Sequence, residues 1–361
     1  MTNASGHQTI QGALRCFLSE AALASFLSVL LVSAWATPAA EIHKPLQIYF
    51  VDVEGGQATL FVTPEGKSLL IDTGWPGNDG RDAERIVSAA KLAGIKKIDY
   101  VLITHYHDDH VGGAPQLVAR IRVGTFIDHG ENRETSAAAQ KMWQTYQGVL
   151  ATGKSKHIVA KPGDVLPIPG MQVRVVSSDG AVIEKPLPRA GGTNTSCGSP
   201  EQSAGDQTEN PRSVGTLITF GKLRILDLGD LTSDKEMELM CPVNKLGPID
   251  IYVVSHHGWS QSGSPALVNG IAPRVAIMDN GAKKGGSPPQ WAIIEKSPGL
   301  EDLWQVHYSE EGADTHNVTA PFIANLQGPD AGNYLKLSAS ADGSFEVFNS
   351  RTQATKKYGA R

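Results

Sequence analysis

The sequence lacks abundant cysteine, an excess of positive charge and long apolar runs. Three cysteines in 361 residues exclude a small fold held together by many disulfides. The formal net charge of −5 does not favour bulk electrostatic capture of nucleic acid. Beyond residue 36 no apolar run reaches the length of about 20 residues that a membrane span needs. The 40% of hydrophobic residues is typical of a globular protein.

The N-terminal region has the features of an export signal. Arg15 precedes a short apolar run at residues 21–32, and residues 34–36 (AWA) fit a small-x-small cleavage site. We therefore expect residues 1–36 to be a cleaved signal peptide, with an uncleaved anchor as the alternative. A cleaved signal places the protein in the periplasm or outside the cell, and no membrane contact beyond the signal is expected.

Short β-type segments alternate with helical ones along the rest of the chain. Strands are expected at residues 46–53, 58–62, 68–71, 98–104, 124–128, 214–220, 223–228, 249–254, 275–278 and within 334–347, and helices at 83–93, 114–120 and 136–150. The order is a β-meander, then βα units, then the same kind of sequence again. It predicts two β layers with helices outside, a four-layer αββα sandwich of the α/β (α+β) class, over residues 45–350.

One long segment, residues 185–212, is rich in Pro, Gly, Ser, Thr and Asn. Loops of this length are uncommon and are usually functional or disordered. Cys197 lies within it. In an oxidising compartment Cys197 could pair with Cys241, and two unpaired thiols are the alternative.

A strand-like segment runs directly into residues 104–113, THYHDDHVGG. Alternate residues at a strand end point the same way, so His105 and His107 could face one metal ion. A turn into a helix could bring Asp109 and His110 beside them. Imidazole and carboxylate are suitable ligands for zinc and related ions. Burying so many polar groups without a metal or partners is costly, so this pattern predicts a metal centre rather than a solvated loop.

The pattern HxHxDH resembles the signature of the metallo-β-lactamase superfamily, and further elements of that superfamily follow in order. Residues 70–74 (LIDTG) resemble an early element whose aspartate, here Asp72, supports the metal site from behind its ligands. Residues 228–230 (LGD) resemble the element whose aspartate, here Asp230, bridges two metal ions. The ordered set implies the superfamily's αββα fold.

Residues 253–258 (VVSHHG) resemble the element that supplies the last histidine ligand. The alignment of the strand and the His-Gly ending favours His257. Adjacent strand residues point to opposite faces, so only one of the two histidines is expected to bind directly. His256 would then lie behind the ligands or face the substrate, unless it takes the place of His257.

The chain departs from many superfamily members in lacking a histidine shortly before the bridging aspartate. Residues 208–213 read TENPRS instead, which resembles the Asn-x-x-Ser segment of the ComEC-like branch and implies that Asn210 supports the site. His129, at the end of a predicted strand, is a candidate to complete the first metal's ligands or to act in catalysis. Its alternative is a capping or core histidine. The resemblance implies one or two ions, zinc in the first place and manganese as an alternative.

The resemblance implies hydrolysis by a metal-bound hydroxide, with Asp109 orienting the water or accepting its proton. In the ComEC-like branch nuclease and phosphorylcholine-esterase type activities occur. The expected substrate is therefore a phosphoric ester, above all a phosphodiester, and nucleic acid is compatible although the net charge does not point to it. A β-lactam or lactone is the second hypothesis, and a secreted, non-catalytic binding module the third.

The segment at residues 280–286 (NGAKKGG) is glycine-rich and basic. If it faces the metal centre, Lys283 or Lys284 could contact a substrate phosphate. An exposed turn is the alternative.

Overall fold

The computed structural model describes residues 44–198 and 205–361, which form two nine-stranded sheets. The expected signal peptide lies outside these residues. In spatial order, the first sheet comprises β18 (Ala354–Tyr358), β17 (Phe345–Asn349), β16 (Leu335–Ala339), β1 (Leu46–Phe50), β2 (Thr59–Val62), β3 (Ser68–Ile71), β4 (Lys97–Leu102), β5 (Arg122–Asp128) and β6 (Lys156–Val159). The second comprises β15 (Ile323–Asn325), β14 (Asp302–His307), β13 (Val275–Met278), β12 (Ile251–Val253), β11 (Leu223–Asp227), β10 (Gly215–Phe220), β8 (Gln172–Ser178) and β7 (Val165–Leu166), with β9 (Ala181–Val182) paired to β8.

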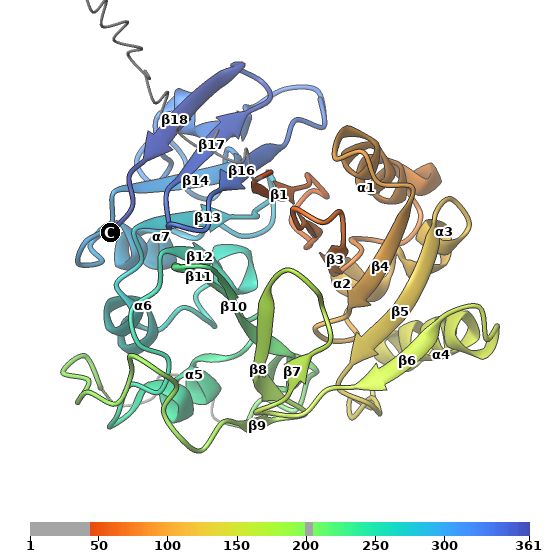
Figure 1. The fold of residues 1–361 in the computed structure, drawn as a ribbon, viewed down its shortest axis with the longest axis horizontal. Helices are drawn as coiled ribbons and strands as arrows, with labels where there is room; N and C mark the ends of the chain where they lie inside the picture. Colours follow the sequence, from red (N-terminus) through yellow and green to blue (C-terminus); the bar gives the residue numbers. More distant parts are fainter. Residues whose placement is uncertain (1–43, 199–204) are drawn as a thin grey trace, which may run out of the picture. The chain divides into compact units, whose positions relative to one another are not determined.

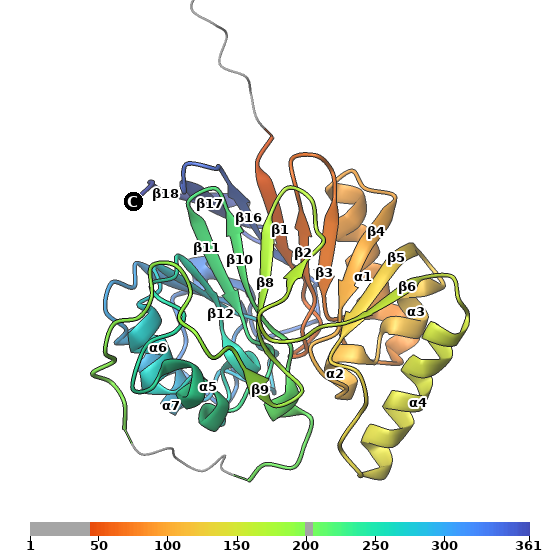
Figure 2. The same ribbon diagram turned by 60° about the horizontal axis from the view of Figure 1, so that its bottom comes forward.

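The two sheets pack face to face, with helices on both outer sides (Figures 1 and 2). The first sheet is covered by α1 (Arg81–Leu92), α3 (Ala114–Val118) and α4 (Ala137–Ala151), and the second by α5 (Ser233–Met240), α6 (Pro265–Ile271) and α7 (Pro288–Glu295). Buried aliphatic and aromatic side chains fill all three interfaces. Each Å² of apolar surface that they remove from water stabilises the fold by about 25 cal/mol. The predicted four-layer αββα sandwich is confirmed.

Most predicted elements are present, with their ends moved by a few residues. The helix predicted at 136–150 is α4, and Ser136 caps it by accepting a hydrogen bond from Ala139 N at 3.2 Å. The sequence pattern did not reveal β6 to β9, β14, β15 or helices α5 to α7. Nor was β18 expected, although it pairs with β17 beyond residue 350, the predicted end of the domain. None of the helices in the described residues has the length and apolar character needed to cross a bilayer.

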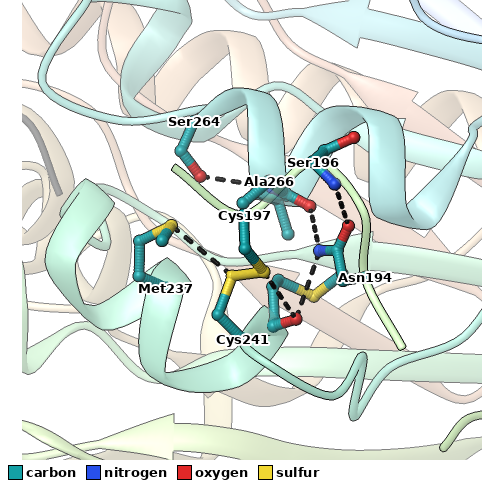
Figure 3. Close-up of a disulfide and its surroundings, with 9 residues drawn as sticks. Asn194, Ser196, Cys197, Met237, Cys241, Ser264 and Ala266 are labelled. Carbon is teal, nitrogen blue, oxygen red and sulfur yellow. Dashed lines mark hydrogen bonds between the residues drawn. A yellow bond between two sulfur atoms is a disulfide. The ribbon is translucent and has the colours of Figure 1, made fainter. Parts of the chain in front are cut away.

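A disulfide between Cys197 and Cys241 ties the long loop to the end of α5 (Figure 3). Asn194 strengthens the same attachment, because its side-chain amide donates to Met240 O at 3.1 Å and to Ala266 O at 2.9 Å. Disulfides persist in oxidising compartments and are rare in the cytosol. The bridge is therefore consistent with a location outside the cytoplasm.

Replacing both cysteines by serine should lower the free energy of unfolding by roughly 2–4 kcal/mol, because the bridge restricts the unfolded chain across a separation of 44 residues. Urea unfolding of the double variant, compared with wild type with and without a reductant, measures the effect. Reduced wild type should resemble the double variant. The prediction is wrong if the double variant unfolds at the same urea concentration as the oxidised protein.

A buried carboxyl at the end of β11 links the two halves of the fold. Asp227 Oδ2 accepts a hydrogen bond of 2.6 Å from the side chain of Gln57, which precedes β2 in the first sheet. Burial raises the pKa of Asp227 to about 7, although a hydrogen bond from Gly229 N favours the charged form; the carboxyls of Asp279 and Asp72 raise it further. A proton on Asp227 thus stabilises the folded state.

Because of the Asp227 carboxyl, the free energy of unfolding should fall as the pH rises from about 4 to about 7. The folded state holds the proton more tightly than the unfolded chain, so the contribution is complete at low pH and is lost as Asp227 ionises. A rise in pKa from 3.8 to about 7 corresponds to roughly 4 kcal/mol. Asp227→Asn should therefore gain stability relative to wild type between pH 4 and pH 8. Urea titrations at both pH values, with a chelator present, measure this gain; equal differences at the two pH values would contradict it.

Candidate metal centre

The histidine-rich segment follows β4 and ends in the short helix α2 (Asp108–Val111). His105 Nε2 lies 3.0 Å from His107 Nδ1 and 3.9 Å from Asp230 Oδ2. These three residues form one group whose potential ligand atoms all lie within 4.8 Å of one another. His105 is fully buried, whereas the side chain of His107 keeps 25% of its surface exposed. The group therefore lies at a point that solvent can reach from one side.

A second group shares Asp230 and adds the remaining predicted ligands Asp109, His110 and His257. His110 Nε2 lies 3.1 Å from Asp109 Oδ2 and 3.2 Å from Asp230 Oδ2. His257 Nε2 lies 3.1 Å from Asp109 Oδ2 and 3.5 Å from Asp230 Oδ1. Asp109 comes from the first sheet and Asp230 from the turn after β11, so the site is built where the two sheets meet.

Both groups fit divalent cations. His110 Nε2 and His257 Nε2 face each other at 3.2 Å between two carboxylates, and a cation between them would satisfy both nitrogens at once. Asp230 Oδ1 is buried and has no hydrogen-bond partner within the described residues. Such an orphaned oxygen is costly unless another group binds it. Because Asp230 belongs to both groups, it is the one side chain placed to bridge two ions.

The electrostatics of two members of the cluster, Asp230 and His105, favour the protonation states that bind metals, whereas the carboxylates around His110 and His257 outweigh burial and raise the pKa of both histidines. Burial opposes the charge on Asp230, but His110 and His256 outweigh it and hold the pKa of this carboxyl well below its usual range. Burial lowers the pKa of His105 well below its usual value, and His110 adds to that effect. The bridging carboxyl is therefore charged and the His105 ring neutral at neutral pH.

Asp72 lies behind the predicted ligand His110. His110 Nδ1 lies 2.7 Å from Asp72 Oδ2, so its other nitrogen, Nε2, points to the metal group. Thr104 fixes the carboxylate in turn: its backbone N–H and its hydroxyl each donate to Asp72 at 2.7 Å. The same hydroxyl lies 3.1 Å from His105 Nδ1. Sequence reasoning missed Thr104, although it directly precedes the histidine cluster.

The two adjacent histidines lie in a tight turn, η3 (Ser255–Gly258), and not in a strand. Both have left-handed backbone angles with φ of 54°, a conformation that costs free energy and is concentrated at functional sites. Strand alternation therefore does not apply: His256 Nε2 also reaches Asp230 Oδ2, at 3.3 Å. His257 nevertheless belongs to the four-residue group, and Asp279 Oδ1 lies 3.4 Å behind its Nδ1. The geometry favours His257 as the ligand and His256 as its neighbour.

The long loop returns to the metal centre through η2 (Asn210–Arg212). Ser213 Oγ lies 3.4 Å from His105 Nδ1, so this loop supports the first group from behind. Asn210 is buried, and its Oδ1 has no hydrogen-bond partner among the described residues.

The structure does not bring His129 into either metal-binding group. Its Nε2 lies 2.7 Å from Glu209 Oε2, and both side chains are fully buried. Glu209 N donates to Glu134 Oε2, and the same oxygen lies 3.0 Å from His107 Nε2. Hydrogen bonds thus connect His129 to the centre through Glu209 and Glu134, and its ring packs against Tyr106, so it occupies the position of a core histidine. Glu134 and Glu209 are supporting residues that carried no motif in the sequence.

Two glycines permit the close packing of the loops around the centre. A Cβ on Gly56 would lie 2.4 Å from Asp109 O, and one on Gly113 would lie 2.1 Å from Thr73 O. Contacts that short are not tolerated, so only glycine lets these backbones approach.

Lys284, from the glycine-rich basic loop, lies at the centre itself. Its Nζ contacts Asp109 Oδ2 and lies 4.9 Å from the Trp75 ring centroid and 5.4 Å from that of Trp259. An adjoining cavity of about 660 Å³ is lined by Lys284, Trp75 and His307 among others. Lys283, in contrast, is exposed. Lys284 is thus the lysine that connects the metal groups with an open cavity.

Comparisons with known proteins agree with this geometry. Residues 51–200 match the model of the metallo-β-lactamase superfamily. Recombination protein 2 of Haemophilus influenzae is 26% identical over 71% of this chain and 27% of its own length, and ComE operon protein 3 of Bacillus subtilis is 22% identical over 69% and 30%. This chain thus matches less than a third of the length of these two relatives.

Further similarities are shorter or are structural. A UPF0173 metal-dependent hydrolase of Polynucleobacter asymbioticus is 31% identical over 41% of this chain and 46% of its own length. The solved structure of the metallo-β-lactamase fold protein YhfI from Bacillus subtilis aligns with a TM-score of 0.44 and 12% identity, over 72% of this chain and 96% of that one. The match to the family model over residues 51–200, the αββα sandwich and the buried His/Asp groups together place the chain in the metallo-β-lactamase superfamily.

Proposed function

We propose that this protein hydrolyses phosphoric esters, and phosphodiesters in particular, outside the cytoplasm. The observation that carries the proposal is the position of Lys284. Its ammonium group touches Asp109 of the candidate metal centre and at the same time lines the adjoining cavity. A substrate that enters from this cavity meets a fixed positive charge beside the metal groups, which suits an anionic phosphodiester.

The residues divide the chemistry between them. His105, His107 and Asp230 would hold one ion, and Asp109, His110, His257 and Asp230 a second. Zinc is the first choice and manganese the alternative, because both accept imidazole and carboxylate ligands. When bound, such ions lower the pKa of a coordinated water and neutralise charge on the phosphoryl oxygens.

The protein's own side chains supply the positioning. Asp109 Oδ2 lies within reach of both His257 and Lys284, so this carboxylate is placed to orient the attacking water and to accept its proton. Lys284 is placed to stabilise the negative charge that grows on the phosphoryl oxygens. The rings of Trp75 and Trp259 flank its ammonium group and restrict its position.

The loop that replaces the usual third histidine also supports a substrate other than a β-lactam. Ser213 lies behind His105, and Asn210 lies three residues before it in the same loop, so no third imidazole reaches the first group in the described residues. A phosphodiester brings its own negatively charged oxygens, which can complete the surroundings of an ion with few protein ligands.

The test is the metal content of the purified mature protein, together with turnover of bis-p-nitrophenyl phosphate and of a chromogenic cephalosporin. We expect bound zinc or manganese and cleavage of the phosphodiester, lost on chelation and restored by the metal. Cleavage of the cephalosporin alone would replace the proposal by β-lactam hydrolysis. A metal-free, inert protein would favour the binding module.

Export is the second part of the proposal. The apolar N-terminal run and the Cys197–Cys241 bridge support it. Expression of the full chain in a bacterium, followed by fractionation and N-terminal sequencing, tests it. We expect a periplasmic or secreted protein that begins near residue 37; an intact N-terminus in the cytoplasmic fraction would refute this part alone.

A further inference from the structure

A second polar cavity, of about 450 Å³, lies on the outer face of the second sheet, far from the metal centre. Arg174 on β8 and Arg224 on β11 point into it, whereas their neighbours Val175 and Ile225 belong to the core between the sheets. Lys222 lies in the hairpin before β11, and the metal centre begins beyond the other end of that strand. At about 3.3 Å per residue, the two sites are roughly 20 Å apart.

In Figure 2 the hairpin that joins β10 and β11 lies in the upper part of the view and α2 in the lower part. The residues that line the cavity include none from α5, α6 or α7.

The lining of this cavity is strongly basic on a chain of net charge −5. It contains five cationic side chains and one carboxylate, namely Arg174, Arg189, Lys222, Arg224, Arg361 and Asp250. Arg361 lies 3.5 Å from the carboxylate of Glu301. Within the part of the chain that the structure describes, none of the other four cations forms an ion pair. Asp250 is the one carboxylate in the lining, so positive charge exceeds negative charge in this cavity.

Arg224 is the most unusual of the four, because it is only 4% exposed. Its guanidinium donates to two backbone carbonyls, Leu246 O at 2.6 Å and Pro188 O at 3.4 Å. Burial lowers its pKa, and the nearby charge of Arg189 lowers it further. A buried guanidinium without a carboxylate is costly, whereas an anion in the cavity would compensate it.

The loop that carries Arg189 is held in place before any ligand binds. Leu187 N donates to Lys245 O, and Gly191 N donates to Asn244 O, both at 2.9 Å. A Cβ on Gly247 would lie 2.6 Å from Arg189 O, so the two backbones pack directly against each other. The backbone that carries Arg189 is thus fixed before a ligand binds, and the fork of a guanidinium group matches two phosphate oxygens.

We propose that this cavity is a binding site for a small anion that carries two linked phosphate groups. Three arginines and a lysine provide the charge that a diphosphate needs, and the volume lies within the range of small-ligand sites, about 300–1,000 Å³. Leu187, Pro188 and Leu217 add an apolar wall that can contact an organic group attached to the diphosphate. Inorganic pyrophosphate and a nucleoside diphosphate share the chemistry that the cations recognise.

The test is calorimetric titration of the purified full chain with inorganic pyrophosphate and, separately, with ADP. Arg174→Gln and Arg189→Gln should each weaken binding by about tenfold or more, since each removes a charge-assisted contact. Lys284→Gln and His107→Ala change the metal centre and should leave this binding step unchanged. Tighter binding of ADP than of pyrophosphate would identify an organic diphosphate as the ligand, and the reverse order an inorganic one.

Because pyrophosphate also binds metal ions, the variants decide where it binds. If His107→Ala abolishes binding and Arg174→Gln leaves it unchanged, the anion binds at the metal centre and the proposal is overturned. Absence of binding to the wild type up to about 5 mM would do the same. Arg189 is exposed and Arg174 partly exposed, so both variants should keep the thermal midpoint of the wild type; a double variant Arg174→Lys/Arg189→Lys, which keeps the charge, should bind at an intermediate strength.

Discussion

Hydrolysis by the Asp109→Ala and His107→Ala variants should fall by more than about 100-fold, because loss of a group that merely supports a ligand already costs 10- to 100-fold. Each substitution removes one member of a metal-binding group, and Asp109 also contacts both His257 and Lys284. Turnover of bis-p-nitrophenyl phosphate and metal content by mass spectrometry measure the two effects together.

The chain offers a matched control for this experiment. Asp108 lies between the two altered positions and is exposed, so Asp108→Ala changes the same charge without touching the centre. It should keep its activity and its metal. Circular dichroism should show all three variants folded, because the three buried cores do not involve these side chains. Full activity of either Asp109→Ala or His107→Ala would show that the assigned site is wrong.

The second large effect is expected for Lys284→Gln. Removing a charge that stabilises the growing negative charge of a transition state typically costs about 10²- to 10³-fold in kcat. Lys284 is not one of the metal-binding residues, so the metal content should stay at the wild-type value. That separates a loss of charge stabilisation from a loss of metal.

Lys283→Gln is the paired control, because Lys283 carries the same charge and lines the same cavity, but within the described residues it forms no ion pair with Asp109. Its kcat/KM should stay close to that of the wild type. The interpretation fails if both lysine variants behave alike, or if Lys284→Gln retains full activity toward the phosphodiester. The ratio of wild-type kcat/KM to that of Lys284→Gln should be smaller for a neutral substrate analogue than for the anionic substrate.

Much of the fold was predictable because its signals are local. The strand at residues 275–278 is a short apolar run with both ends marked, and the structure reproduces those limits. The elements that were missed carry weaker patterns. In β6, Lys156 and His157 are both exposed and the strand pairs only with β5, so no alternation of buried and exposed residues marks it.

The candidate site also has parts that the sequence predicts and parts that it does not. The six predicted ligands converge, since each lies in a short motif at the end of a strand. The partner of His129 could not be predicted, because Glu209 lies 80 residues away in a loop without regular structure. The position of Lys284 beside Asp109 depends on a contact between residues 175 apart. Such pairings follow from the packing of the two sheets, which sequence spacing does not encode.

The division of the metal centre between the two sheets has a consequence for how the molecule matures. His105, His107, Asp109 and His110 are present once the first third of the chain exists, whereas Asp230 and His257 come more than a hundred residues later. During synthesis, a growing chain shorter than 257 residues cannot hold the complete set. Metal binding is therefore a late event that stabilises the contact between the two sheets. A chelator added during refolding should yield a species in which each sheet has formed but the amide protons between the two sheets exchange rapidly.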